Sequence, residues 1–214
     1  MAVKILPAVL ASSAQQLRRQ LQLASEYSST IHLDIADGSL TSTRTVGPKT
    51  LANLHSTTTV EAHIMSTRPD RRLTTVLALG VRRVIIHVEL GMALKPYLAL
   101  FRSQKISVIL AINPATPLRR LDRWVDLVQG VQVMGVVPGR LGARWHPQTV
   151  ARIRQLRRRW PRLAISCDGG MTPETLPAVV RAGATTIIVG SYLQQHDDPD
   201  VAWQKLRAAG RASA

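Results

Sequence analysis

Short apolar runs alternate with amphipathic stretches along the whole chain. The runs are rich in β-branched residues and lack a polar face, which is the pattern of strands that are buried on both sides. They cover residues 3–10, 30–35, 59–65, 84–88, 107–112, 131–137, 163–167 and 186–189. Between them, stretches such as 14–24, 147–159 and 173–181 carry apolar residues at helical spacing, and two of these three open with Pro. The pattern therefore predicts strands that alternate with helices.

The number of these units predicts the fold. Eight buried parallel strands within 214 residues favour a closed barrel surrounded by helices, because an open sheet of eight strands usually needs more chain for its edges. No linker or low-complexity segment interrupts the alternation. We therefore predict the α/β class and a single (βα)8 TIM barrel that forms one domain over residues 1–214.

Histidine and aspartate residues stand at the carboxyl ends of three of the predicted strands. His32 and Asp34 are two residues apart and must share one face of their strand, while His63 and Asp168 end two further strands. The active sites of such barrels gather at these strand ends. Two imidazoles and two carboxylates suit a divalent cation such as Zn, Mn, Fe(II) or Co, and the aspartates can also transfer protons. The sequence thus predicts a metal site.

Other residues near the strand ends have two open interpretations. The turns after the sixth, seventh and eighth strands can form a phosphate cradle of backbone N–H groups, or they can be ordinary strand-to-helix turns. Met65 and Met134 can line the pocket or pack in the core. We expect His87 to be a hydrogen-bonded core residue and Asp37-Gly38 to be a turn. The residues of the candidate cradle are Gly139, Gly142, Gly169, Gly170, Gly190 and Ser191.

The formal charge of +15 and the pI of about 11.5 resemble those of nucleic-acid-binding proteins. The arginines are spread in pairs, with the densest group over residues 152–162, so we interpret them as solvated outer faces of helices. Attraction of an anionic substrate or non-specific adhesion of nucleic acid are the alternatives. The single Cys167 excludes an internal disulfide and is expected to pack in the core. No apolar run approaches the length of a membrane span, and we interpret the apolar start as the first strand. We expect a cytoplasmic protein.

Several of these segments together resemble the ribulose-phosphate 3-epimerase family, and the resemblance covers nearly the whole chain in order. The most specific segments are IHLDIADG at 31–38, AHIM at 62–65 and CDGG at 167–170. Further matching segments lie at 6–10, 46–48, 112–117, 133–139 and 189–191.

The resemblance implies a barrel of the ribulose-phosphate-binding type and a specific activity. The activity is interconversion of D-ribulose 5-phosphate and D-xylulose 5-phosphate, in the pentose phosphate pathway, by two-aspartate proton transfer through a cis-enediolate. Asp34 and Asp168 would be the catalytic pair, and both would hold one divalent cation together with His32 and His63. A homo-oligomer is also implied. The implied substrate-binding residues are His63, Met65, Met134, Gly139, Arg140, Leu141, Gly142, Asp168, Gly169, Gly170, Gly190 and Ser191.

The chain departs from the family pattern at several positions, which keeps alternatives open. Ala8 and Ala11 stand where the family has serines, Ala36 replaces a methionine, and the loop 137–143 differs from the usual phosphate-binding sequence. Another ketose phosphate, such as allulose 6-phosphate, is therefore an alternative substrate. A degenerate barrel that binds polyanions through its basic surface is a second alternative. A decarboxylase of the orotidine-phosphate type is disfavoured, because Ala36 stands where that array requires lysine.

Overall fold

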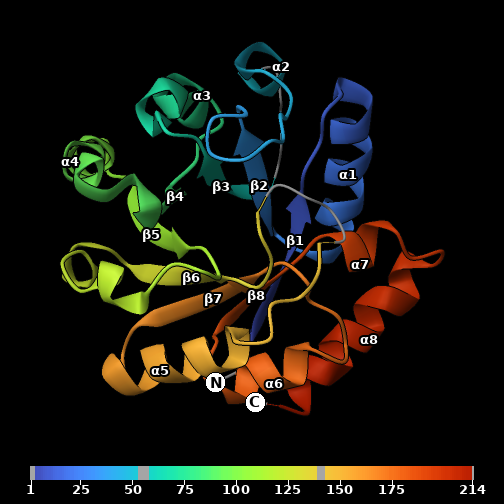
Figure 1. Ribbon diagram of the computed structural model, residues 1–214. Helices are drawn as coiled ribbons and strands as arrows, with labels where there is room; N and C mark the ends of the chain where they lie inside the picture. The colour runs from blue at the N-terminus through green and yellow to red at the C-terminus, as the bar shows by residue number, and fades with distance from the viewer. Residues whose placement is uncertain (1–2, 53–57, 139–142, 214) are drawn as a thin grey trace.

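The computed structural model describes residues 3–52, 58–138 and 143–213. Within these ranges, eight parallel strands form one closed barrel, in which each strand pairs with the next and β8 pairs with β1 (Figure 1). The prediction of a single (βα)8 barrel is confirmed. The strands are β1 (Lys4–Val9), β2 (Thr30–Ala36), β3 (Thr59–Met65), β4 (Arg83–His87), β5 (Ser107–Ile112), β6 (Gly130–Met134), β7 (Ala164–Asp168) and β8 (Thr186–Val189).

Helices surround the barrel and cover the outer face of the strands (Figure 1). They are α1 (Ala14–Tyr27), α2 (Pro48–Ala52), α3 (Leu73–Ala78), α4 (Leu94–Ser103), α5 (Thr149–Arg159), α6 (Leu176–Arg181), α7 (Ser191–Gln194) and α8 (Pro199–Arg211). Side chains cap two of the longest: Ser13 accepts a hydrogen bond from the Gln16 N–H before α1, and Asp198 accepts one from the Val201 N–H before α8.

The connection between β5 and β6 differs from the regular alternation that the sequence predicts. It contains only two 3₁₀ turns, η3 (Leu118–Leu121) and η4 (Val125–Leu127), in place of an α-helix. Pro114 and Pro117 lack a backbone N–H and therefore disfavour a continuous helix in this short segment. Two other connections carry a 3₁₀ turn before their helix, namely η1 (Pro69–Arg72) and η2 (Val88–Ala93).

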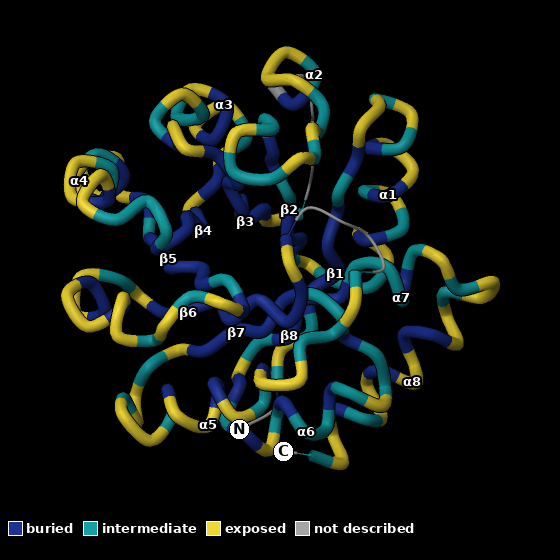
Figure 2. The backbone as a smooth tube through the Cα atoms, viewed as in Figure 1, coloured by how far each residue is buried: buried dark blue, intermediate teal, exposed yellow. Residues whose placement is uncertain are grey.

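The strands are mostly buried (Figure 2), and the buried apolar side chains form one large and two small clusters. Most buried apolar side chains lie in one large cluster that includes residues of the strands and of the surrounding helices, for example Leu110 and Phe101. Two small clusters lie apart from it; one contains Ile85 and Ile109, and the other contains Leu6 and Ile188. Because side chains alternate along a strand, these residues share their faces with polar residues such as His87, which lies two positions after Ile85.

The interpretation of the arginines as solvated outer faces of helices is wrong for one residue. Arg154, Arg158, Arg159 and Arg162 are exposed, as expected for an outer helix face, but Arg152 is buried. Its Nη2 donates hydrogen bonds to the backbone carbonyl oxygens of Asn113 and Thr116, 3.2 and 2.8 Å away. This arginine therefore fastens α5 to the loop after β5, because both carbonyls need a donor where helix and loop pack together.

The strand ends lie close to their predicted positions, with one difference that matters for the site. The predicted run 131–137 ends as a strand at Met134, where the Gly135 N–H makes a last bond of the β6–β7 ladder to the Asp168 carbonyl oxygen at 2.6 Å. Met134 and Asp168 are partners in the register of β6 and β7 and end their strands together. No helix in the described part of the chain is long and apolar enough to cross a membrane.

Candidate active site

Three strands bring the predicted metal residues together at the carboxyl end of the barrel. Asp34 of β2 is the register partner of His63 of β3, and His32, two residues earlier on β2, is the partner of Glu61. Asp168 is the last residue of β7. His32 and His63 are fully buried, and Asp168 is only 8% exposed. Because side chains alternate along each strand and the register aligns the neighbouring strands, these side chains lie on one inner face.

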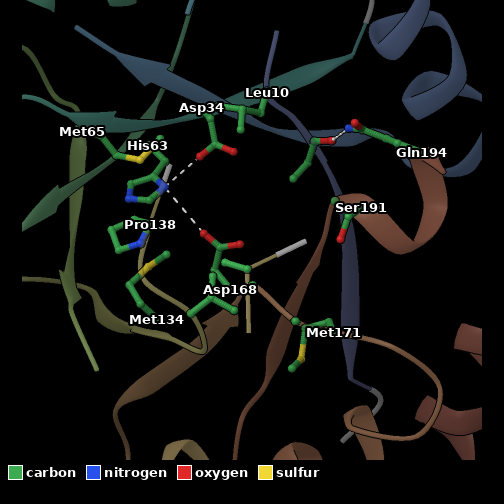
Figure 3. A pocket seen from close by; sticks show the side chains of 16 residues that line it. Leu10, Asp34, His63, Met65, Met134, Pro138, Asp168, Met171, Ser191 and Gln194 are labelled. Atoms are coloured by element: carbon green, nitrogen blue, oxygen red, sulfur yellow. Dashed lines mark hydrogen bonds and ion pairs between the residues drawn. The ribbon is translucent and has the colours of Figure 1, made fainter. Parts of the chain in front are cut away.

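The four side chains form a compact cluster. One ligand atom from each of His32, Asp34, His63 and Asp168 can be chosen so that all lie within 4.8 Å of one another. His63 Nδ1 is 2.9 Å from Asp34 Oδ1 and 3.6 Å from Asp168 Oδ2, so the ring nitrogen faces both carboxylates (Figure 3). His32 Nε2 faces the same two groups at 3.6 and 3.8 Å.

The state of His32 shows that these residues fit a divalent cation. Its Nδ1 lies 2.8 Å from Glu61 Oε1, and because a carboxylate only accepts, this nitrogen carries the proton. The other ring nitrogen, Nε2, is buried without a hydrogen-bond partner. An unpartnered imidazole nitrogen aimed at two carboxylates is the donor set of a metal site, and the outer carboxylate, Glu61, orients the ligand ring.

Burial and neighbouring charges push the two aspartates in opposite directions. Burial raises the pKa of Asp168 to about 6, and the negative charge of Asp34 adds to the rise. Burial would also raise the pKa of Asp34, but the imidazoles of His32 and His63 outweigh it and hold that pKa well below its usual range. Two carboxyl groups whose pKa values lie far apart are suited to hold one proton between them as acid and base.

A pocket opens directly above this cluster, and Figure 3 shows Asp34, His63 and Asp168 on one side of it. Among the predicted substrate-binding residues, those that line it are His63, Met65, Met134, Asp168, Gly169, Gly170, Gly190 and Ser191. The predicted contacts of Gly139, Arg140, Leu141 and Gly142 fall outside the described residues. His32 is too deeply buried to line the pocket and contacts the carboxylates from below.

The turn after Asp168 depends on glycine. Gly169 and Gly170 have φ angles of +90° and +69°, in the left-handed region that side chains with a Cβ rarely adopt. A Cβ at Gly170 would also come within 2.8 Å of the Trp145 ring. These two residues therefore let the chain turn tightly beside the pocket while Trp145 packs against the turn.

Sequence reasoning missed three polar residues that contact the cluster or its neighbours. Glu61 orients His32, and the Gln132 Nε2 group donates to Asp168 Oδ2 at 3.0 Å. Glu89 bonds to His87. A signal for the first two was present, since Glu61 and Gln132 each stand two positions before a predicted site residue and share its face. The prediction that His87 is a hydrogen-bonded core residue is confirmed, because it is buried and contacts both Glu89 and His63.

Of the three alanines that depart from the family pattern, one lines the pocket and two are buried away from it. Ala8 lines the pocket, beside Leu10 and Gln194, and its carbonyl oxygen accepts a hydrogen bond from the Gln194 side chain. Ala11 and Ala36 are buried and are not among the lining residues. The loss of a hydroxyl at Ala8 therefore changes the pocket surface directly.

Comparisons with known proteins agree with this geometry. The profile of the "Ribulose-phosphate 3 epimerase family" matches residues 4–194. The chain is 28% identical to "Ribulose-phosphate 3-epimerase, cytoplasmic isoform" of Oryza sativa subsp. japonica, over 99% of this chain and 96% of the relative. It is 30% identical to "Ribulose-phosphate 3-epimerase" of Rhodobacter capsulatus, over 88% of this chain and 85% of the relative. A solved structure of 3-hexulose-6-phosphate synthase shares the fold, with a TM-score of 0.68 and 20% identity. The match covers 98% of this chain and 99% of that structure's chain.

Proposed function

The chain belongs to the ribulose-phosphate 3-epimerase family, and on that premise we propose that it interconverts D-ribulose 5-phosphate and D-xylulose 5-phosphate by inverting C3. The observation that carries the proposal is the compact arrangement of His32, Asp34, His63 and Asp168 below a pocket, with a His32 nitrogen that has no hydrogen-bond partner and is aimed at both carboxylates. A binding protein would have no need for two buried carboxylates at the floor of its pocket, where their burial is costly.

These four residues would hold one divalent cation, and Zn, Fe(II), Mn and Co all suit the donor set. When bound, the cation would acidify the C3 hydrogen of the substrate and balance the negative charge that develops on the neighbouring oxygens.

The proton transfers fall to the two aspartates. One carboxylate removes the C3 proton from one face of the sugar, and the other delivers a proton to the opposite face of the planar intermediate, so C3 inverts. In the reverse direction the roles exchange. The Gln132 amide holds Asp168 Oδ2 by a hydrogen bond, which leaves Oδ1 of the same carboxyl group for proton transfer.

The walls of the pocket divide between an apolar and a polar part. Met65 lies beside His63 and Met134 beside Asp168, and both line the pocket (Figure 3). They would exclude water from the reacting carbon. Gly170, Gly190 and Ser191 also line the pocket and would bind the phosphate through backbone N–H groups.

The test is turnover of D-ribulose 5-phosphate by the purified protein, with chelator, after metal add-back, and in an Asp168→Asn variant. We expect formation of xylulose 5-phosphate that chelator stops and metal restores, and that Asp168→Asn slows by about 10²–10⁴-fold. Asp197→Asn, at an exposed position, serves as the matched control and should leave turnover unchanged. A folded, metal-loaded protein without turnover would refute the proposed substrate.

Ala8 favours a second candidate substrate. Its methyl group in the pocket wall leaves more room than a serine hydroxyl and offers no hydrogen bond, which suits a longer ketose phosphate such as allulose 6-phosphate. Parallel assays of both sugar phosphates decide between them by the ratio of kcat/KM. A chain that binds neither cation nor sugar phosphate, but binds nucleic acid at low salt only, would instead be the degenerate polyanion-binding barrel.

A further inference from the structure

A row of polar side chains contacts His63 from the side away from the pocket. His63 Nε2 is 2.9 Å from His87 Nε2, and the two rings stack with an interplanar angle of 19°. The other nitrogen of His87, Nδ1, is 3.2 Å from Glu89 Oε2. Both histidines are fully buried, and they come from the neighbouring strands β3 and β4. The row therefore connects the candidate cation site to a carboxylate that lies outside it.

The chemistry of these contacts fixes where the protons lie. A carboxylate accepts hydrogen bonds only, so the nitrogen of His87 that faces Glu89 must carry a proton. A neutral imidazole has one N–H, which leaves His87 Nε2 as a bare acceptor. Two nitrogens 2.9 Å apart share one proton, and it must then belong to His63 Nε2. His63 Nδ1 forms a hydrogen bond with Asp34 Oδ1 at 2.9 Å and also faces Asp168 (Figure 3). With the Nε2 proton fixed, Nδ1 is the nitrogen whose electron pair a cation between these groups would take in place of a proton.

We infer that His87 and Glu89 are positioning residues that keep the proton of His63 on Nε2 and thereby present Nδ1 to the cation. This inference rests on the cation site of the proposed function. His32 needs no such intermediary, because Glu61 contacts its ring directly. His63 has no carboxylate at its outer nitrogen, and His87 transmits the effect of Glu89 across one further ring.

We call the hydrogen bonds that join Glu89, His87 and His63 the relay, and a backbone N–H group makes their direction testable. The N–H of Asn113 donates to Glu89 Oε1 at 2.9 Å and can act only as a donor. In a Glu89→Gln variant the amide oxygen would accept this hydrogen bond, so the amide NH₂ would face His87 Nδ1. Every hydrogen bond in the row would then reverse, so His63 Nε2 would become an acceptor and His63 would keep its proton on Nδ1, where it blocks the cation.

The first measurement is a titration of the cation-free protein with Co²⁺, in which calorimetry and visible absorption detect binding. We expect Glu89→Gln to weaken Co²⁺ binding about 10–100-fold, which is typical when an outer partner of a ligating histidine is lost. Glu26→Gln removes the same charge from an exposed position on α1 and should bind Co²⁺ like the unmodified chain. Thermal unfolding of each variant shows that the fold is kept.

The second measurement reads the proton itself. Long-range ¹H–¹⁵N spectra of the cation-free protein, labelled at its six histidines, distinguish a protonated from a bare Nε2. We expect a proton on His63 Nε2 in the unmodified chain and its loss in Glu89→Gln. At position 87, His87→Gln keeps an acceptor for His63 and should restore most of the Co²⁺ affinity, whereas His87→Leu removes the acceptor and should not.

The two measurements distinguish failure of the relay from failure of the proposed cation site. A folded Glu89→Gln variant that binds Co²⁺ normally and keeps the proton on His63 Nε2 overturns the relay. If the unmodified chain binds no Co²⁺, the proposed cation site fails, and the spectra of the cation-free protein still decide whether Glu89 controls the His63 proton. Should Glu89→Gln fail to fold, the relay is tested by His87→Gln and His87→Leu, and equal Co²⁺ affinity of these two variants overturns it.

Discussion

Asp37 holds the end of β2 to two other segments, and its replacement by Asn gives a stability change that depends on pH. Its Oδ1 accepts hydrogen bonds from the hydroxyl and the N–H of Ser39, at 2.5 and 3.0 Å. Its Oδ2 accepts from the Ser66 hydroxyl at 2.6 Å and lies 3.3 Å from Arg72 Nη2. Asn offers one acceptor oxygen and no charge, so it cannot replace these contacts.

The magnitude follows from the pKa of Asp37. Partial burial would raise this pKa, but the hydrogen bonds from Ser39 and Ser66 and the charge of Arg72 outweigh it and lower the pKa from 3.8 to about 2. A folded-state pKa below the unfolded value stabilises the protein above pH 4, and this contribution is lost as the pH falls through 2. The shift corresponds to about 2 kcal/mol of unfolding free energy at neutral pH and to about half of that at pH 3.

The assay is urea unfolding of the unmodified chain and of Asp37→Asn at several pH values between 7 and 3. We expect the variant to be less stable by about 2 kcal/mol near neutrality, with the difference shrinking toward about 1 kcal/mol at pH 3. Asp197→Asn, at an exposed position, is the control and should change little. A difference between Asp37→Asn and the unmodified chain that is constant with pH, or that grows toward acid, would refute the reasoning.

Three further outcomes test the site and the packing. Asp168→Asn should lower kcat by about 10²–10⁴-fold while the circular dichroism spectrum stays unchanged, because Asn keeps the shape but cannot carry the proton. Phe101→Ala should cost about 3–5 kcal/mol in urea unfolding, since this ring is fully buried in the large core cluster. Arg152→Lys should cost about 1–3 kcal/mol in the same experiment, because an ammonium group cannot satisfy both carbonyl oxygens as the guanidinium does. Arg154→Lys, at an exposed position on the same helix, should be neutral.

The sequence predicts the barrel and the four clustered residues for the same reason. Strand periodicity fixes which side chains share a face, and parallel strands that carry polar residues at their ends bring those ends together. His32 and Asp34 therefore share a face because of their spacing, and His63 and Asp168 are expected beside them because they end other strands of the same barrel. The homo-oligomer and the cytoplasmic location stay predictions.

Contacts between side chains on different elements could not be predicted from the periodicity of single strands. The bond between His63 and His87 requires the register of β3 against β4, which no local pattern encodes. The burial of Arg152 depends on two carbonyl groups that lie about 40 residues away along the chain. The missing helix between β5 and β6 is a partial exception, because Pro114 and Pro117 are visible in the sequence and disfavour it.

The pairing of β1 with β8 has a consequence for how the protein folds. Lys4 meets Thr186 and Pro7 meets Val189, so the barrel closes only when segments from opposite ends of the chain come together. Contacts between such distant segments slow folding, because a long loop must be ordered before they form. While β8 is missing, β1 and β7 each leave a strand edge unpaired, and such edges can pair with other chains. A nascent chain that lacks β8 is thus the species most exposed to aggregation during synthesis.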